Sequence, residues 1–381
     1  MSLNAFDRQH PSMGQKLWQI RWLFVTLICI AGGVGATMLY SAANASLDPW
    51  ASRHLIRFAV GLLLMVGIAL TDIRLWLKHA YLFYAGALAL LAAVEIVGSV
   101  GMGAQRWIDL GVINLQPSEL MKIAVVLALA RYFHGATVED VGRPLYLVAP
   151  LLLVAAPAAL VLRQPDLGTA LMLVLAGGAM FFIAGVRLWM FAVVAVAALG
   201  GAPLVWSLLH DYQRQRVLTF LDPESDPLGT GYHIIQSKIA LGSGGLFGKG
   251  FMQGSQSHLN FLPEKQTDFV FTMLAEEFGL VGSLGLLGLY TLILAYGFAI
   301  AIASRSHFGR LLALGVMITF FLYLFINVAM VMGLIPVVGV PLPLVSYGGT
   351  AMVTLMFGFG LVMSVYVHRD VVIGRRAGDG P

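Results

Sequence analysis

Ten long apolar stretches, separated by shorter polar ones, dominate the hydrophobic pattern of the chain. Each is close to the roughly 20 residues that a helix needs to cross about 30 Å of hydrocarbon. We therefore predict an all-α polytopic membrane protein, with residues 1–381 forming a single integral membrane domain of about ten transmembrane helices. The predicted spans are 22–43, 53–71, 78–97, 117–134, 144–163, 167–184, 187–209, 268–303, 309–334 and 348–367.

Lysine and arginine are distributed unevenly among the short loops and chain ends. With the N-terminus inside, the outer loops and their flanks hold only Arg53, Arg57, Arg106 and Arg163. The inner set is Arg8, Lys16, Arg21, Arg74, Lys78, Arg131, Arg143, Arg187, Arg305, Arg310, Arg369, Arg375 and Arg376. Because positive residues mark the cytoplasmic side, we expect residues 1–21 and 368–381 in the cytoplasm and the long loop 210–267 outside.

The composition excludes several classes of function. Hydrophobic residues make up 59% of the chain and charged residues only 11%, and the net charge of +4 comes from topological loops, so a nucleic-acid partner is not expected. Cys29 is the only cysteine, which rules out a disulfide within the chain. The nine histidines form no ligand pair at helical spacing, so a dedicated metal site is not expected either.

Charged residues inside the eighth apolar stretch are the most unusual feature of the pattern. Thr267 and Asp268 are good N-cap residues, and Thr272 and Glu276 follow Asp268 at four and eight residues, on one helix face. A carboxylate near the bilayer centre costs at least about 2.5 kcal/mol, so Glu276 and Glu277 must face other helices or a wet cavity. Two interpretations remain open: a capped helix with packing glutamates, or a polar site at the helix mouth.

Two other predicted spans begin with charged residues. The span at 117 carries Glu119 one turn in and Lys122 three residues later, which indicates either an ion pair with an outward-reaching lysine or a cation for an anionic substrate. The span at 167 follows Asp166, either a plain N-cap or a second carboxylate of the same cavity.

The predicted topology places four such helix starts on one side. The last span opens with Ser346, Gly348 and Gly349, whose bare backbone would let N–H groups approach an anion. Spans four, six, eight and ten all begin outside, where Arg106 and Asp268 also lie, so their positive dipole ends converge there. We therefore expect an external site for an anionic ligand.

Several weaker signals have a structural interpretation. Gly279, Gly282, Gly285 and Gly288 repeat every three residues and predict close helix packing. Asn327, inside the ninth span, is expected to donate an interhelical hydrogen bond. The outer loop contains a short amphipathic segment around residues 234–239 that could lie on the membrane surface.

Taken together, the motifs resemble those of the SEDS proteins of bacterial cell-wall synthesis, over most of the chain. They are RW at 106–107, QPSE at 116–119 with Lys122, QPDLG at 164–168, LPE at 262–264, TDF at 267–269, AEEFG at 275–279, and PLP at 341–343 with SYGG at 346–349. The IALGSGG run at 239–245 and PVVGVPLPLVSYGG from residue 336 resemble the elongation branch of the family. Gln266 departs from a histidine that is common before the TD pair, which weakens any proposal that uses a histidine there.

This resemblance implies a peptidoglycan glycosyltransferase that polymerises lipid II at the outer face of the cytoplasmic (inner) membrane during cell elongation. The implied partners are a class B penicillin-binding protein transpeptidase, lipid II, undecaprenyl pyrophosphate and other membrane proteins of the elongation complex. Asp268 matches the family's essential carboxylate. The matching cavity residues are Arg106, Glu119, Lys122 and Asp166, and we add Trp107, Ser346, Gly348 and Gly349 as candidate substrate-binding residues.

The implied chemistry needs one base. A carboxylate takes the proton of the acceptor sugar hydroxyl as that hydroxyl attacks the donor anomeric carbon, and direct displacement inverts that carbon. Pyrophosphate leaves without a proton donor but needs charge stabilisation, from Lys122, Arg106 and the helix starts, with or without a divalent cation such as Mg²⁺ or Mn²⁺. A free aspartate has a pKa of about 3.9, so we predict that partial burial raises the pKa of Asp268.

Two alternatives remain at the level of sequence. A lipid II flippase would also have many helices with embedded charges, although polar residues gathered on one side favour an enzyme. A scaffold that only holds a penicillin-binding protein would tolerate substitution of Asp268.

Overall fold

The computed structural model describes residues 13–101, 104–109, 111, 114–208, 211–226, 229–259, 261–262 and 264–374. Helices occupy all ten predicted spans, and seven of the described helices are long and apolar enough to cross a membrane. The multi-span helical fold is therefore confirmed. The helices are α2 (Trp22–Ala42), α3 (Ala51–Ala69), α4 (Ile73–Val97), α5 (Pro117–His134), η2 (Pro144–Leu147) continued by α7 (Val148–Arg163), α8 (Leu167–Ile183), α9 (Leu188–Leu208), α13 (Val270–Ala303), α14 (His307–Val331) and α15 (Gly349–Val367).

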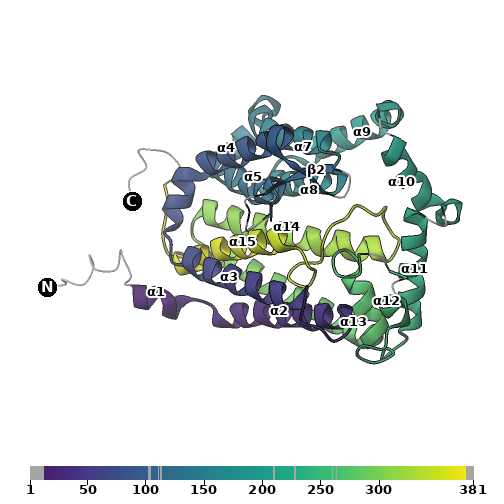
Figure 1. Ribbon diagram of the computed structural model, residues 1–381. Coiled ribbons are helices and arrows are strands. Elements are labelled where there is room, and N and C mark those ends of the chain that lie inside the picture. The colour runs from purple at the N-terminus through teal and green to yellow at the C-terminus, as the bar shows by residue number, and fades with distance from the viewer. Residues whose placement is uncertain are drawn as a thin grey trace.

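The two ends of the bundle differ in character. The short helix α1 (Met13–Gln19) packs near the end of α15, where the Arg21 guanidinium lies 4.7 Å from the centre of the Tyr366 ring. The opposite end carries α10 (Asp211–Leu221), η3 (Pro223–Ser225), α11 (Thr230–Ser243) and α12 (Ser255–His258) (Figure 1). We call this second end the outer end, following the predicted topology.

Helices α5, α14 and α15 form the centre of the bundle. Nearly every residue of α5 is buried, and the Phe320 ring of α14 meets the Phe359 ring of α15 edge-on at 5.3 Å. By contrast, many of the described side chains of α9 are exposed, including Leu188, Val194 and Leu199. A helix that is apolar all round but unburied in the protein needs lipid as its surroundings.

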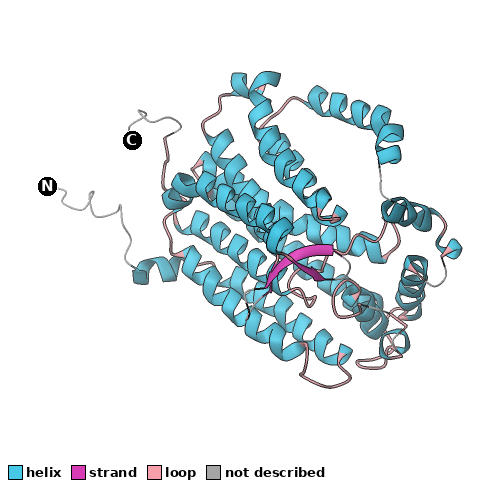
Figure 2. Cartoon of the chain, turned by 45° about the horizontal axis from the view of Figure 1, so that its top comes forward, coloured by secondary structure: helices cyan, strands magenta, loops and turns pink. Residues whose placement is uncertain are grey.

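The long outer loop is more structured than the hydrophobic pattern indicated. The amphipathic segment forms α11, but it packs on α13 and α14 rather than lying free on a membrane surface. Ile234 is buried there, and the Ser237 hydroxyl donates to the Val331 carbonyl at 2.7 Å. A small antiparallel sheet, β1 (Ser99–Gly101), β2 (Ala104–Asp109) and β3 (Asn114–Leu115), also escaped prediction (Figure 2).

Helix α13 is broken at Gly279, whose φ of 66° and ψ of −158° are open only to glycine. The break exposes backbone groups, and the loop after α11 pairs with them. Lys249 N–H donates to the Glu276 carbonyl at 3.0 Å, and Leu280 N–H donates to the Gly245 carbonyl at 2.9 Å. The outer loop therefore completes the hydrogen bonding of a transmembrane helix.

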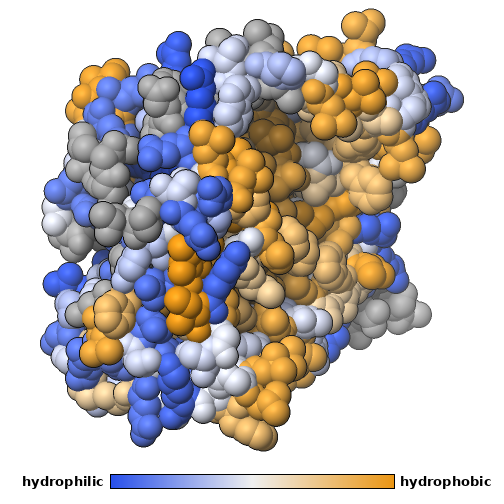
Figure 3. All heavy atoms as spheres, turned by 90° about the vertical axis from the view of Figure 1, so that its right-hand side faces the viewer, coloured by the Kyte–Doolittle hydropathy of each residue, from blue (hydrophilic) through white to orange (hydrophobic). Residues whose placement is uncertain are grey.

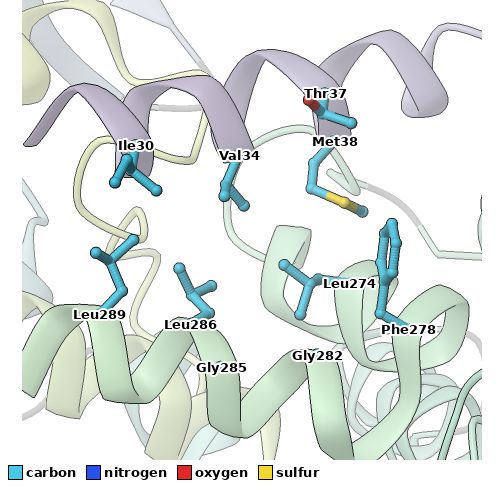
Figure 4. Close-up of a pocket in the computed structure, with 10 residues that line it drawn as sticks. All are labelled: Ile30, Val34, Thr37, Met38, Leu274, Phe278, Gly282, Gly285, Leu286 and Leu289. Atoms are coloured by element: carbon cyan, nitrogen blue, oxygen red, sulfur yellow. The ribbon is translucent and has the colours of Figure 1, made fainter. Parts of the chain in front are cut away.

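The prediction of close helix packing along the glycine repeat is wrong. A methyl group on Gly285 or Gly288 would meet no atom within 4 Å. Instead, Gly282 and Gly285 line an apolar pocket of about 380 Å³ between α2 and α13, beside Val34 of α2 (Figure 4). Gly282 and Gly285 therefore face α2 across this pocket instead of packing against it.

Candidate active site at the outer helix starts

Asp268 lies in a turn just before α13. The helix begins at Val270, and its N-cap is Phe269, which makes no capping bond through its side chain. The prediction that Thr267 and Asp268 cap this helix is therefore wrong. The turn is closed by Thr267 N–H, which donates to the Glu264 carbonyl at 3.0 Å, and by the Thr267 hydroxyl, which donates to the Glu264 carboxylate at 2.8 Å.

The carboxylate of Asp268 is partly buried at the outer end. Its pKa is raised from 3.8 to about 7, chiefly by burial and also by the nearby charge of Glu264, while the charge of Arg216 on α10 lowers it. The predicted direction of this shift agrees with the structure. A carboxylate with a pKa near neutrality is matched to general-base work at physiological pH.

The segment at 332–348, which leads into α15, lies against two helix starts. A side chain on Gly168, at the start of α8, would meet the Val338 carbonyl oxygen at 2.5 Å. A methyl group on Gly339 would lie 3.4 Å from Asp268 Oδ2, at the start of α13. Three of the four helix starts that were expected to converge, those of α8, α13 and α15, therefore meet around this segment.

Hydrogen bonds tie the turn at 264–269 to the same segment. Tyr347 N–H donates to the Gln266 carbonyl at 2.8 Å, and the Ser346 hydroxyl donates to the Thr267 carbonyl. Ser346 also accepts from Leu342 N–H at 2.8 Å, so its hydroxyl is engaged on both sides. The role of Ser346 in substrate binding stays a prediction, whereas its role in holding the turn is visible.

Asn327 of α14 contacts the residue that carries the candidate base. Its side-chain amide donates to the Asp268 carbonyl at 2.9 Å and to the Val340 carbonyl at 2.7 Å. Asn327 is therefore a hydrogen-bond donor, as expected, but the prediction that its bond joins two helices is wrong. Its acceptors are main-chain atoms at the helix mouth rather than another transmembrane helix.

Glu119 and Lys122 form a buried ion pair on α5. Lys122 Nζ lies 2.7 Å from Glu119 Oε1, and the exposed fractions of the two side chains are only 2% and 5%. Tyr323 donates its hydroxyl to the other Glu119 oxygen, and Lys122 Nζ lies 4.2 Å from the centre of the Tyr323 ring. The prediction that Lys122 reaches outward is therefore wrong. Tyr323, which contacts both members of the pair, lies on α14 one turn before Asn327.

Arg106 and Asp166 come together beside the sheet. Asp166 caps α8, accepting from Thr169 N–H at 3.1 Å, and its Oδ2 lies 3.9 Å from Arg106 Nε. Arg106 also donates to the Gln164 carbonyl at 3.1 Å and remains 27% exposed. Asp166 is therefore both the N-cap of α8 and a neighbour of the Arg106 guanidinium. Trp107, which follows Arg106 in β2, is partly buried.

Arg57, which was expected only to mark the outer side of the membrane, is a further candidate. Its guanidinium lies 4.8 Å from the centre of the Tyr347 ring, and a methyl group on Gly349 would meet it at 2.8 Å. This places a partly buried cation at the N-terminus of α15, next to Gly348 and Gly349. A cation beside a helix start is suited to an anion.

Glu276 and Glu277 belong to a separate cluster. Both are fully buried; Lys249 Nζ lies 2.7 Å from Glu276, and the Ser41 hydroxyl donates to Glu277 at 2.6 Å. His258 Nε2 lies 3.2 Å from Glu277. These contacts hold the outer loop and α2 onto α13, which supports the packing interpretation of the two glutamates.

Within the described part of the chain, no group of three or more histidine, cysteine, aspartate or glutamate side chains is placed to hold a metal ion. A divalent cation bound mainly by a substrate pyrophosphate needs fewer protein ligands. Among the protein's own cations, Arg57, Arg106 and Arg216 are partly exposed, and the charge of Arg216 acts on Asp268.

The comparison with known families matches residues 19–371 to the "Cell cycle protein" family of FtsW, RodA and SpoVE. The chain belongs to this family. Among its FtsW/RodA/SpoVE relatives, the peptidoglycan glycosyltransferase MrdB of Escherichia coli K12 is 49% identical over 345 residues, 88% of this chain and 90% of the relative. The peptidoglycan glycosyltransferase RodA of Treponema pallidum is 33% identical, over 90% of this chain and 96% of its own.

Solved structures of the FtsW/RodA/SpoVE family share the fold. A chain from a study of a peptidoglycan synthase complex, on the coordination of polymerization and crosslinking, superposes with a TM-score of 0.79 at 36% identity, covering 92% of this chain and 98% of that one. RodA of Thermus thermophilus superposes with a TM-score of 0.69 at 32% identity, covering 92% and 97%. Relatives named RodA and MrdB agree with the elongation-branch resemblance.

Proposed function

We propose that this protein is a peptidoglycan glycosyltransferase of the RodA/MrdB type, which polymerises lipid II at the outer face of the cytoplasmic membrane with Asp268 as general base. The observation that carries the proposal is the setting of Asp268. It lies partly buried where helix starts meet at the outer end, with a pKa of about 7. The names of the relatives and the motif resemblance support the same activity.

The reaction joins two lipid-linked sugars. The 4-hydroxyl oxygen of the acceptor N-acetylglucosamine forms a bond to the anomeric carbon of the donor N-acetylmuramic acid. The bond from that carbon to pyrophosphate breaks, and undecaprenyl pyrophosphate leaves with the electron pair. Asp268 accepts the hydroxyl proton, so the products are a glycosidic bond, a protonated Asp268 and the free pyrophosphate lipid.

Positive groups near the base would stabilise the departing pyrophosphate. Arg57 and Arg106 are the best placed, because each is partly exposed and each lies beside a helix start, α15 and α8 respectively. Lys122 is enclosed with Glu119, so its predicted contact with substrate would require this pair to open. In the closed pair, Lys122 contacts Glu119 and the Tyr323 ring.

The isoprenoid chain of the substrate needs an apolar path. Figure 3 looks onto the outer end and shows apolar atoms lining a hollow beside a more polar surface. Next to the bundle, α9 presents side chains such as Val193 and Leu199 to the surroundings rather than to protein. A lipid-linked substrate could therefore keep its chain in hydrocarbon while its sugars reach the polar helix starts.

The partner that best fits is a class B penicillin-binding protein transpeptidase. A structurally similar chain comes from a study of a peptidoglycan synthase complex that couples polymerization and crosslinking. A transpeptidase beside this protein would crosslink each strand as it leaves the site. In the proposed orientation, which rests on the distribution of positive residues, both termini lie in the cytoplasm and the site lies outside.

The test is polymerisation of lipid II by purified protein with its transpeptidase partner, comparing wild type with Asp268→Asn. This substitution keeps the size of the side chain and removes the base, so glycan chains should fall by at least about 100-fold, in the range expected for general-base removal. Wild-type rates from Asp268→Asn would exclude the base role. Absence of glycan product from the wild-type complex would instead favour a flippase or a scaffold.

A further inference from the structure

The turn that carries Asp268 is held from outside rather than by its own helix. Three carbonyls in a row, those of Gln266, Thr267 and Asp268, accept hydrogen bonds from groups distant in sequence. Helix α13 has no side-chain cap at its start. The position of the candidate base therefore depends on these three donors.

Of the three donors, the Asn327 amide makes the contact closest to the base. It is fully buried, and both of its N–H groups are used, one on Asp268 and one on Val340. The backbone next to Val340 lies close to the carboxylate of Asp268: a methyl group on Gly339 would lie 3.4 Å from Asp268 Oδ2. One side chain thus fixes the backbone of Asp268 and the backbone beside its carboxylate at the same time.

Packing alone does not account for this arrangement. Thr319, two turns earlier on α14, is also buried, but its hydroxyl donates only to the Gly315 carbonyl of its own helix. Asn327 instead joins α14 to two segments that are 59 and 13 residues away in sequence. Without it, two buried carbonyls would lose a donor, and water would be drawn toward them.

We propose that Asn327 is a positioning residue that holds the carboxylate of Asp268 against the Gly339–Val340 backbone and keeps water from it. This inference rests on the proposed function of Asp268 as the base. Because Asn327 is fully buried and its amide already donates to the carbonyls of Asp268 and Val340, it acts through Asp268. Its loss should lower kcat for lipid II polymerisation far more than it changes KM.

The pH profile separates positioning from general stability. Burial is the largest cause of the raised pKa of Asp268. If Asn327 is removed and water reaches the carboxylate, that pKa falls back toward its ordinary range. The acid limb of the kcat profile should then move to lower pH, even though the rate at neutral pH decreases.

The experiment uses the full chain with its transpeptidase partner and compares Asn327→Ala with the matched control Thr319→Ala. Asn327→Ala should lower kcat about 10- to 100-fold, the range of a misplaced base, and shift the acid limb down by at least one pH unit. Thr319→Ala should do neither. A rate loss with an unmoved acid limb, or an equal loss in the control, would overturn the positioning role.

Ser346→Ala guards against a variant that fails to fold. It removes a single oxygen, the donor to the neighbouring Thr267 carbonyl, and should shift the acid limb in the same direction by a smaller amount. If folded Ser346→Ala and Asn327→Ala both keep the wild-type profile, the inference is wrong.

A second readout distinguishes this inference from the base assignment. Infrared titration without substrate records the protonated carboxyl band of Asp268, identified by its loss in Asp268→Asn. In Asn327→Ala the midpoint of this band should fall by at least one pH unit. An unchanged midpoint rejects positioning even if Asp268→Asn is inactive, whereas a lowered midpoint with an active Asp268→Asn rejects only the base assignment.

Discussion

At the scale of single residues, the basicity of Asp268 determines how the protein should respond to pH. Its pKa in the fold is raised to about 7, so the carboxylate is protonated below that pH and cannot accept a proton. Polymerisation should therefore fall about tenfold per unit as pH drops below 7. Initial rates between pH 5 and 8 measure this.

The control for the pH series is reversibility. Enzyme held at pH 5 and returned to pH 7.5 should regain full activity, because a protonation step leaves the fold intact. A rate that stays flat from pH 8 to pH 5 would contradict a base with a raised pKa.

The ion pair of Lys122 and Glu119 makes a prediction about stability. Both side chains are buried, so Lys122→Met leaves a buried carboxylate without its cation and should cost about 3–5 kcal/mol of unfolding free energy. Adding Glu119→Gln removes the stranded charge while an acceptor for Tyr323 remains, and should recover most of the loss. Unfolding of the single and double variants in detergent measures the coupling; additive losses would show that the pair is not coupled.

At the scale of elements, the break in α13 depends on one glycine. Gly279 has a φ that other residues rarely adopt, and a methyl group there would come within 2.3 Å of the Gly248 backbone nitrogen. Gly279→Ala should therefore lower the free energy of unfolding by about 1–3 kcal/mol and weaken the packing of the outer loop on α13. Thermal unfolding and limited proteolysis of this loop measure both effects.

Gly285→Ala is the matched control on the same helix. Its methyl group would enter open space, and alanine favours the helix over glycine by about 0.5–1 kcal/mol. This variant should be neutral or slightly more stable. Equal destabilisation by both substitutions would indicate a general intolerance of α13 rather than a special conformation at Gly279.

The helices were predictable because each transmembrane element satisfies its own backbone and must be apolar over a fixed length. The break at Gly279 could not be predicted, because the hydrogen bonds that complete it come from a loop some thirty residues earlier. The glycine repeat on the same helix also supported the wrong interpretation, close helix packing. The same limit applies to Asn327: its sequence context predicts a donor inside the membrane, but not that the acceptor is Asp268. Arg57 looked like a topological charge until the fold placed Tyr347 and Gly349 beside it.

At the scale of the whole molecule, the 332–348 segment organises the candidate site. It contacts the starts of α8 and α13 and leads into α15, while α14 reaches it through Asn327 and reaches the Glu119–Lys122 pair through Tyr323. The individual polar residues could be selected from sequence because charges are costly in a membrane. Their grouping depended on how four distant helix ends pack, which no local pattern records.

The orientation of the molecule is the last prediction, and everything about the substrate depends on it. The distribution of positive residues predicts that α1 and the end of α15 lie in the cytoplasm. The structure sets α10, α11 and α12 at the opposite end (Figure 1). The test uses a membrane-impermeant maleimide and two variants in a Cys29→Ser background, Ser225→Cys and Asp370→Cys, both at exposed positions. Ser225→Cys should react in intact cells. Asp370→Cys should react only after the membrane is opened. The reverse pattern would put Asp268 on the cytoplasmic side, where a base could not serve the assembly of glycan strands outside the cell.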